Sequence, residues 1–209
     1  MSHFTSTRRL STLLAALLFA GAASAQTAST GATTGATTGT TASARASGAS
    51  AAMGNASQLK RADSAFLKNA AEAGHTEIEG SKLALSKSTN EKVKTFAQQM
   101  VGDHTKTADE LGVLAASKGV ELPTGPSLAQ KARLKLLSAR DGAGFDKHYA
   151  DFVGVDAHKD TIKLFQKAAQ EATDPEVKAF ATKTLPALEH HLKMAQDLKA
   201  VTDQEKKSK

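Results

Sequence analysis

The chain has 209 residues, no cysteine, 4% aromatic residues and a formal net charge of +6. Without cysteine there is no disulfide framework, and no basic stripe with interleaved aromatics indicates a nucleic-acid-binding protein. No phosphate-binding loop or nucleophile–base pair stands out, so no class of enzyme is indicated. With so few aromatic residues, the composition also gives no sign of a pocket for a large organic cofactor.

Residues 1–25 have the features of a secretory signal peptide. Arg8 and Arg9 precede the apolar run Leu10–Phe19, and Ala23-Ser24-Ala25 supplies a small-residue cleavage site. Because a bilayer span takes about 20 residues, we expect cleavage near Ala25 rather than an uncleaved anchor. Cleavage would leave 25 basic and 21 acidic residues, a net charge of +4. We therefore expect a periplasmic or secreted protein that is not an integral membrane protein.

The remainder divides by composition into three parts. Residues 26–57 are almost entirely Ala, Gly, Ser and Thr, including the slipped repeat "GATTGATTGTT", which is typical of a flexible linker. Residues 58–203 form the expected domain, long enough to bury a core. Residues 204–209 form a basic tail.

The first half of the domain predicts two long helices. The first covers about residues 60–88, with an apolar stripe that includes Phe66, Leu67 and Ala70. "STNE" predicts a capping box, with Ser88 as N-cap and Glu91 at N3. The second helix covers about residues 89–118 and is expected to end at Gly119.

The second half predicts a short helix and two more long ones. "SLAQKARLKLLSAR" is the short helix, inside the connection that follows the second long helix. The third long helix is expected from near Phe145 to about 172. Asp174-Pro175-Glu176 predicts the start of the fourth, which would run to about 203. Pro186 lies inside that helix, and we expect a kink there.

The predicted helices form two hairpins with tight turns, joined by a connection of about 25 residues. Tight turns require antiparallel neighbours, and the long connection can cross the length of a bundle. This layout predicts an all-α, ferritin-like antiparallel four-helix bundle whose long crossover contains a short extra helix. An up-down-up-down bundle with a decorated middle loop is the alternative.

Each long helix places one polar residue on its apolar face: Glu77, His104, His158 and His191. Each lies about 12–17 residues from its hairpin turn, which is about 18–26 Å at 1.5 Å per residue. In helices of about 30 residues this is the middle layer. We therefore expect the four side chains to meet inside the bundle.

Three imidazoles and one carboxylate are competent ligands for Zn²⁺, Fe²⁺, Cu²⁺ or Ni²⁺. We interpret Glu77, His104, His158 and His191 as a candidate site for a single transition metal ion. A hydrogen-bonded Glu–His network without metal is the alternative. The usual di-iron pattern requires two Glu-x-x-His motifs and two further glutamates, whereas this chain has only Glu72–His75, which the helical wheel places outside. His148, Glu189 and His190 are interpreted as solvated.

Several stretches of the domain are distinctive. The longest begins at "FLKNAAEAGHTEIEGSKLALSKSTNEKVK", and the most specific are "FAQQMVGDH" and "LPALEHHL", with "FDKHY" and "AHKDTIKLF" between them. These stretches resemble the domain of unknown function 4142 family, whose members are exported bacterial proteins with a ferritin-like fold. The resemblance covers about residues 60–199. It implies an all-helical, ferritin-like domain and supplies no reaction. The shared motifs include Glu77, Asp103, His104, His158 and His191.

Two functions follow as hypotheses. The first is an exported metal-binding bundle, which leaves open whether it is an enzyme. The second is a non-enzymatic envelope or stress-related protein whose polar layer is purely structural. An envelope protein partner or a homo-oligomer is compatible with either.

Overall fold

The computed structural model describes residues 59–207, and the predicted signal peptide and linker lie outside them. This part of the chain is all helical and contains no strand, which confirms the predicted all-α class. The elements are α1 (Arg61–Lys87), α2 (Glu91–Ser117), α3 (Leu128–Ser138), α4 (Gly142–Tyr149), the π-helical segment η1 (Ala150–Asp156), α5 (Ala157–Glu171) and α6 (Pro175–Lys207). None of the described helices is long and apolar enough to cross a membrane.

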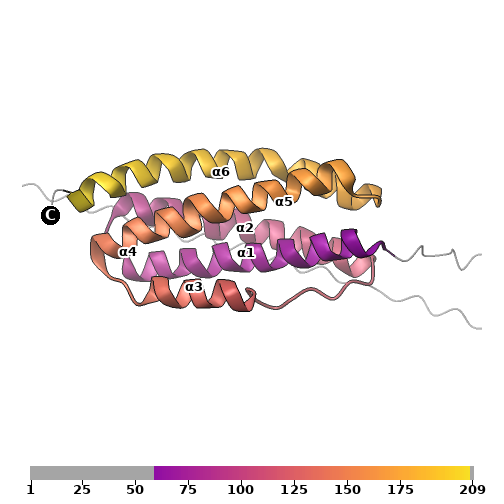
Figure 1. Cartoon of the computed structure of the whole chain (residues 1–209), viewed down its shortest axis with the longest axis horizontal. Helices are drawn as coiled ribbons and strands as arrows, with labels where there is room; N and C mark the ends of the chain where they lie inside the picture. The colour runs from indigo at the N-terminus through magenta and orange to yellow at the C-terminus, as the bar shows by residue number, and fades with distance from the viewer. Residues whose placement is uncertain (1–58, 208–209) are drawn as a thin grey trace, which may run out of the picture. The chain divides into compact units, whose positions relative to one another are not determined.

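The long helices pack as two pairs, α1 with α2 and α5 with α6. The pairs meet where α1 contacts α5 and where α2 contacts α6. In Figure 1, α1 and α6 run toward one end of the bundle, and α2 and α5 run toward the other. The connection after α2 returns along the outside of α1 and carries α3 with it (Figure 1). The predicted short helix therefore exists and lies within the connection.

The third long helix differs from its predicted form. It begins at Gly142, whose φ of 54° fits the residue's freedom to adopt left-handed backbone. It then passes through η1 before it continues as α5. Apolar periodicity predicts a single α-helix from near Phe145, because one π-helical turn hardly changes the apolar stripe.

The capping box predicted for the turn between α1 and α2 is wrong. Asn90, not Ser88, is the N-cap of α2, and its side chain accepts a hydrogen bond from the Lys92 N–H. Ser88 is the C-cap of α1, and its hydroxyl accepts from the Asn90 N–H at 3.0 Å. Glu91 is consequently the first residue of the helix and not N3. The two-residue error arises because Ser and Asn both cap well.

The predicted start of α6 is confirmed, whereas the helix ends later than predicted. Asp174 caps the helix as expected, since its carboxylate accepts from the N–H groups of Glu176 and Val177. The helix continues to Lys207, beyond the predicted bound of 203, and the Asn90 amide donates to Glu205 near this end. Pro186 lies inside α6, and the kink expected there stays a prediction.

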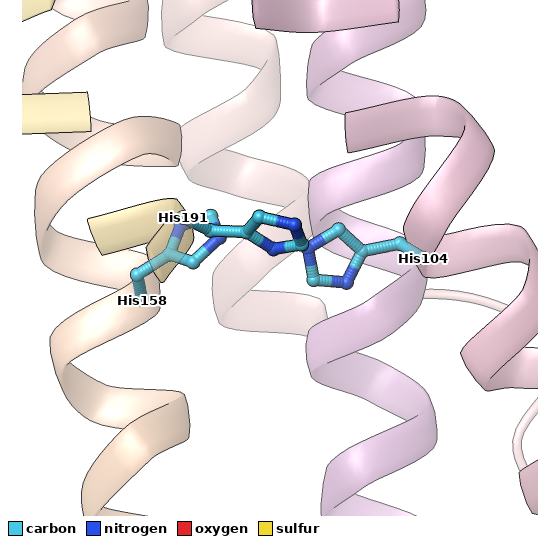
Figure 2. A group of neighbouring side chains, drawn as sticks. All are labelled: His104, His158 and His191. Carbon is cyan, nitrogen blue, oxygen red and sulfur yellow. The ribbon is translucent and has the colours of Figure 1, made fainter. Parts of the chain in front are cut away.

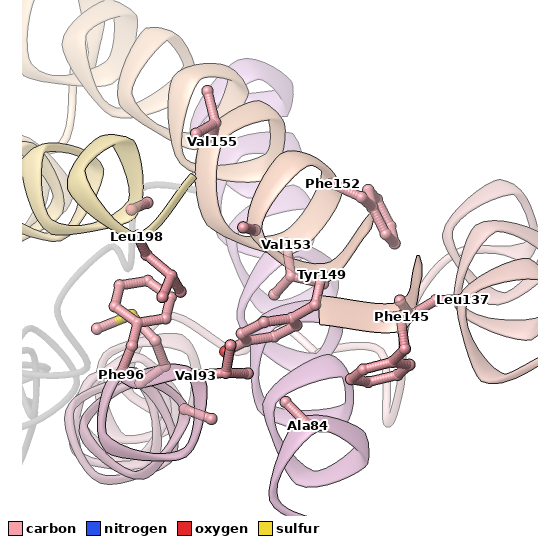
Figure 3. Close-up of a cluster of buried hydrophobic side chains, with 14 of the residues drawn as sticks. Ala84, Val93, Phe96, Leu137, Phe145, Tyr149, Phe152, Val153, Val155 and Leu198 are labelled. Carbon is pink, nitrogen blue, oxygen red and sulfur yellow. The ribbon is translucent and has the colours of Figure 1, made fainter. Parts of the chain in front are cut away.

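Two apolar clusters fill the bundle on either side of its middle. Figure 3 shows the one that we call the Phe96 cluster. Its members are Ala84, Val93, Phe96, Ala97, Met100, Leu134, Leu137, Phe145, Tyr149, Ala150, Phe152, Val153, Val155, Ala195 and Leu198. The Phe165 cluster is made of Phe66, Leu67, Ala70, Ala71, Leu111, Ala115, Ile162, Phe165, Ala168, Ala172, Val177, Phe180, Ala181 and Leu188. In each long helix the candidate polar residue falls between the two clusters.

Candidate metal centre

The structure brings together all four predicted site residues, one from each long helix. Glu77 comes from α1, His104 from α2, His158 from α5 and His191 from α6, and none is more than 5% exposed. The three imidazole rings are grouped between the helices (Figure 2), with ring centroids 5.3–5.6 Å apart. One nitrogen from each ring lies within 4.8 Å of one from each of the others.

The Glu77 carboxylate joins two of these rings. Its Oε2 atom is 2.6 Å from His104 Nε2 and 3.2 Å from His158 Nε2. Its other oxygen, Oε1, accepts a hydrogen bond from the Thr161 hydroxyl at 3.4 Å. A single carboxylate oxygen therefore faces two imidazole nitrogens inside a buried layer.

Outer hydrogen bonds fix which nitrogen two of the rings present to the centre. His158 Nδ1 lies 3.2 Å from the carbonyl oxygen of Val153, which can only accept, so Nδ1 carries the hydrogen. His191 Nε2 lies 3.1 Å from the Asp103 carboxylate, so Nε2 carries the hydrogen there. When these rings are neutral, His158 Nε2 and His191 Nδ1 hold bare lone pairs. Metal-ligating histidines commonly have outer partners of these two kinds.

The inner atoms of the four side chains face one another and make no hydrogen bond to a residue outside the layer. These atoms are Glu77 Oε2, His104 Nε2, His158 Nε2 and His191 Nδ1, each shielded from solvent. Two pairs among them are close, since Glu77 Oε2 lies 2.6 Å from His104 Nε2 and 3.2 Å from His158 Nε2. Donors that each lie about 2.1 Å from one ion are themselves about 3.0–3.4 Å apart. The 3.2 Å pair falls in this range, and the 2.6 Å pair is shorter.

The electrostatics of the layer couple the carboxylate to the rings. Burial opposes ionisation of Glu77, but His104 and His158 outweigh burial and lower its pKa to about 2. Burial likewise lowers the pKa of His104, but Glu77 outweighs it and the pKa is raised. For His191, burial and then the charges of His104 and His158 lower the pKa to about 4. The carboxylate of Glu77 thus favours a cation beside it. A second proton, on the ring of His191, is disfavoured.

The residues that the sequence analysis excluded are not members of the histidine group, although the His190 ring lies 6.4 Å from that of His191. His190 and Glu189 are exposed, and His75 is bonded through Nε2 to the carbonyl of Pro123. His148 is half-buried and is not part of the histidine group.

Two contributors to the site were missed by the sequence analysis. Val153 acts through its backbone carbonyl, for which an amino-acid sequence contains no signal. Thr161 acts through a hydroxyl on the buried face of α5, and its spacing of three residues from His158 could have identified it. Asp103, named above among the residues of the shared motifs, lies behind His191 in the structure.

Comparisons with known proteins agree with the resemblance seen in the motifs. Among curated proteins, none matches this chain. A solved structure with a similar fold is that of a conserved hypothetical protein, rv2844, from Mycobacterium tuberculosis. The two are 19% identical, the match covers 66% of this chain and 91% of that one, and the TM-score is 0.53, so the likeness concerns the fold alone. Residues 48–198 match the family model described as Domain of unknown function (DUF4142), and the chain therefore belongs to that family.

Proposed function

We propose that the chain is a ferritin-like four-helix bundle that binds one transition metal ion through Glu77, His104, His158 and His191. The ferritin-like topology is supported by two antiparallel pairs whose connection runs the length of the bundle (Figure 1). Bundles of this kind build metal sites from side chains on facing helices. The four-residue layer in the middle of this bundle has that arrangement.

One observation carries the metal proposal: two bare imidazole lone pairs and a carboxylate oxygen converge in a buried layer, and no residue outside the layer forms a hydrogen bond to any of them. Buried polar atoms are nearly always paired, and leaving one unpaired costs about 1–3 kcal/mol. His158 Nε2 and Glu77 Oε2, 3.2 Å apart, both offer electron pairs when the ring is neutral. A cation bound between them would satisfy both at once.

The donor set favours a borderline transition metal. Three imidazole nitrogens and one carboxylate oxygen suit Zn²⁺, Fe²⁺, Cu²⁺ or Ni²⁺, and they lack the oxygen-rich shell that Ca²⁺ and Mg²⁺ prefer. A water in a fifth position would allow redox or hydrolytic chemistry. Because no residue of the layer selects one over the other, we propose binding and no reaction.

A second candidate is a metal-free structural bundle, such as an envelope or stress-related interaction protein. The 2.6 Å contact between His104 and Glu77 favours it, because a single proton on His104 would hold this pair together. The raised pKa of His104 agrees with that protonation. In this case the layer would fix helix register and functional partners would bind the outside.

The cellular setting is part of the same proposal. The signal-like residues 1–25 support export to the periplasm or beyond the cell, after cleavage near Ala25. An envelope protein or a second copy of the chain is the expected partner, and neither nucleic acid nor insertion into a membrane is expected.

Elemental analysis of the chain, purified without a histidine tag, tests the proposal. We expect about one equivalent of a transition metal in the parent and none in a His104→Ala/His158→Ala variant. His148→Ala/His190→Ala is the matched control, because it also removes two histidines but leaves the layer intact, and it should keep the metal. A parent that stays metal-free after incubation with each candidate ion would leave the structural network as the function.

A further inference from the structure

His158 lies two residues after the end of η1, the one π-helical segment of the described residues. In η1 the N–H of Ala157 bonds to the carbonyl of Phe152, five residues back. An α-helix would have paired that N–H with the Val153 carbonyl. The Val153 carbonyl instead accepts from the ring of His158 at 3.2 Å. Short π-helical turns of this kind occur frequently at functional sites.

Two glycines allow η1 to pack closely between α1 and α6. A Cβ atom on Gly80 of α1 would lie 2.6 and 3.2 Å from the two Cγ atoms of Val153. A Cβ atom on Gly154 would lie 3.1 Å from the Cβ of Ala195 on α6. Because Val is branched at Cβ and stiff at χ1 in a helix, its side chain cannot turn away easily. A methyl group at position 80 would therefore push the backbone of η1 outward.

We propose that η1 is the positioning element of the metal centre, with Gly80 and Gly154 as positioning residues that set the Val153 carbonyl against His158. The carbonyl holds the hydrogen on Nδ1 and aims Nε2 at Glu77 Oε2, 3.2 Å away. Outer partners of metal-binding histidines typically change metal affinity 10–100-fold when they are lost. The inference rests on the proposed metal-binding function and adds how one ligand is oriented.

Cobalt binding tests the positioning role of η1, because the visible absorption of bound Co²⁺ depends on the geometry of its ligands. Gly80→Ala should weaken Co²⁺ binding about 10–100-fold and change the absorption of the bound ion. Gly74→Ala is the matched control, since it lies on the same helix and its Cβ would meet no atom within 4 Å. Its cobalt affinity and spectrum should equal those of the parent.

A rescue variant separates positioning from simple loss of stability. Gly80→Ala/Val153→Ala removes the two closest atoms that the new methyl group would meet, leaving the end of the Leu134 side chain at 3.3 Å. It keeps the Val153 carbonyl, so the parent's spectrum and most of its affinity should return. Val153→Ala alone should lower the melting temperature and leave the spectrum unchanged. If Gly80→Ala does not fold, Gly154→Ala carries the test, because its closest contact is the milder 3.1 Å, and it should change the cobalt spectrum.

The outcomes distinguish this inference from the function on which it rests. A parent that binds no cobalt and no other transition metal would overturn both. A parent that binds cobalt, with Gly80→Ala matching it in affinity and spectrum, would overturn the positioning role and leave the metal site standing.

Discussion

The polar layer around Glu77 and the apolar clusters on either side of it are buried to the same degree but are stabilised differently. Glu77 and His158 are completely buried, as is Leu67 in the Phe165 cluster. In the clusters, attraction depends on area and close packing and has little directional preference. In the layer, each atom needs a particular partner at a particular angle. A change in a cluster should therefore reduce stability alone, while a change in the layer should also alter what the protein binds.

Replacing the shared carboxylate should have the largest effect on the layer. We expect Glu77→Ala to abolish metal binding, because it removes the only anionic ligand and the oxygen that faces two rings. In the metal-free protein it should lower the free energy of unfolding by about 3 kcal/mol. This is the low end of the range for a broken buried pair, because His104 can lose its proton. Elemental analysis and denaturant unfolding measure the two effects.

Glu79→Ala is the control for this change, because Glu79 is exposed two residues away on the same helix. It should keep the metal and shift the free energy of unfolding by no more than about 0.5 kcal/mol. Full metal content in Glu77→Ala would mean that the histidines alone hold the ion, and the carboxylate would lose its place in the ligand set.

An equally buried apolar residue should show the opposite pattern. We expect Leu67→Ala to lower the free energy of unfolding by about 2–5 kcal/mol, because it leaves a cavity in the Phe165 cluster. Metal content and the spectrum of bound cobalt should stay at the parent level. Loss of metal from this variant, at a temperature where it remains folded, would show that the cluster and the layer are coupled.

The same difference explains which features could be predicted from sequence. Apolar periodicity locates a helix and its buried face, so α2 and the inward placement of His104 were predicted correctly. The four-residue layer followed because heights along a helix can be counted from its turns. The count does not reveal the conformation of the backbone. η1 has nearly the same apolar stripe as an α-helix, and Val153 acts on His158 only through its carbonyl. The Ser88 error has a related cause, since two capping residues two positions apart fit the same pattern.

A change at Asp103 should have the smallest effect on stability. It is the most selective test of the difference between the polar layer and the apolar clusters. Asp103 is not one of the proposed ligands, and 38% of its side chain is exposed, so its contribution to stability should be small. Its carboxylate accepts from His191 Nε2 and thereby leaves Nδ1 bare toward the centre. We expect Asp103→Ala to weaken metal affinity about 10–100-fold, with one ion still bound at saturation. Competition with a chelator of known affinity measures the change.

The control for Asp103 has to remove the same charge from the same helix. Asp109→Ala does so, because Asp109 is an exposed residue of α2 outside the layer, and its metal affinity should equal that of the parent. If both variants lose affinity equally, the effect is one of overall charge, and the tautomer of His191 does not depend on Asp103. If only Asp103→Ala loses affinity while both unfold like the parent, a half-exposed hydrogen bond controls the centre without stabilising the fold. That result would mean that a directional hydrogen bond at the surface beside the layer also controls metal affinity, at a position where apolar packing contributes nothing.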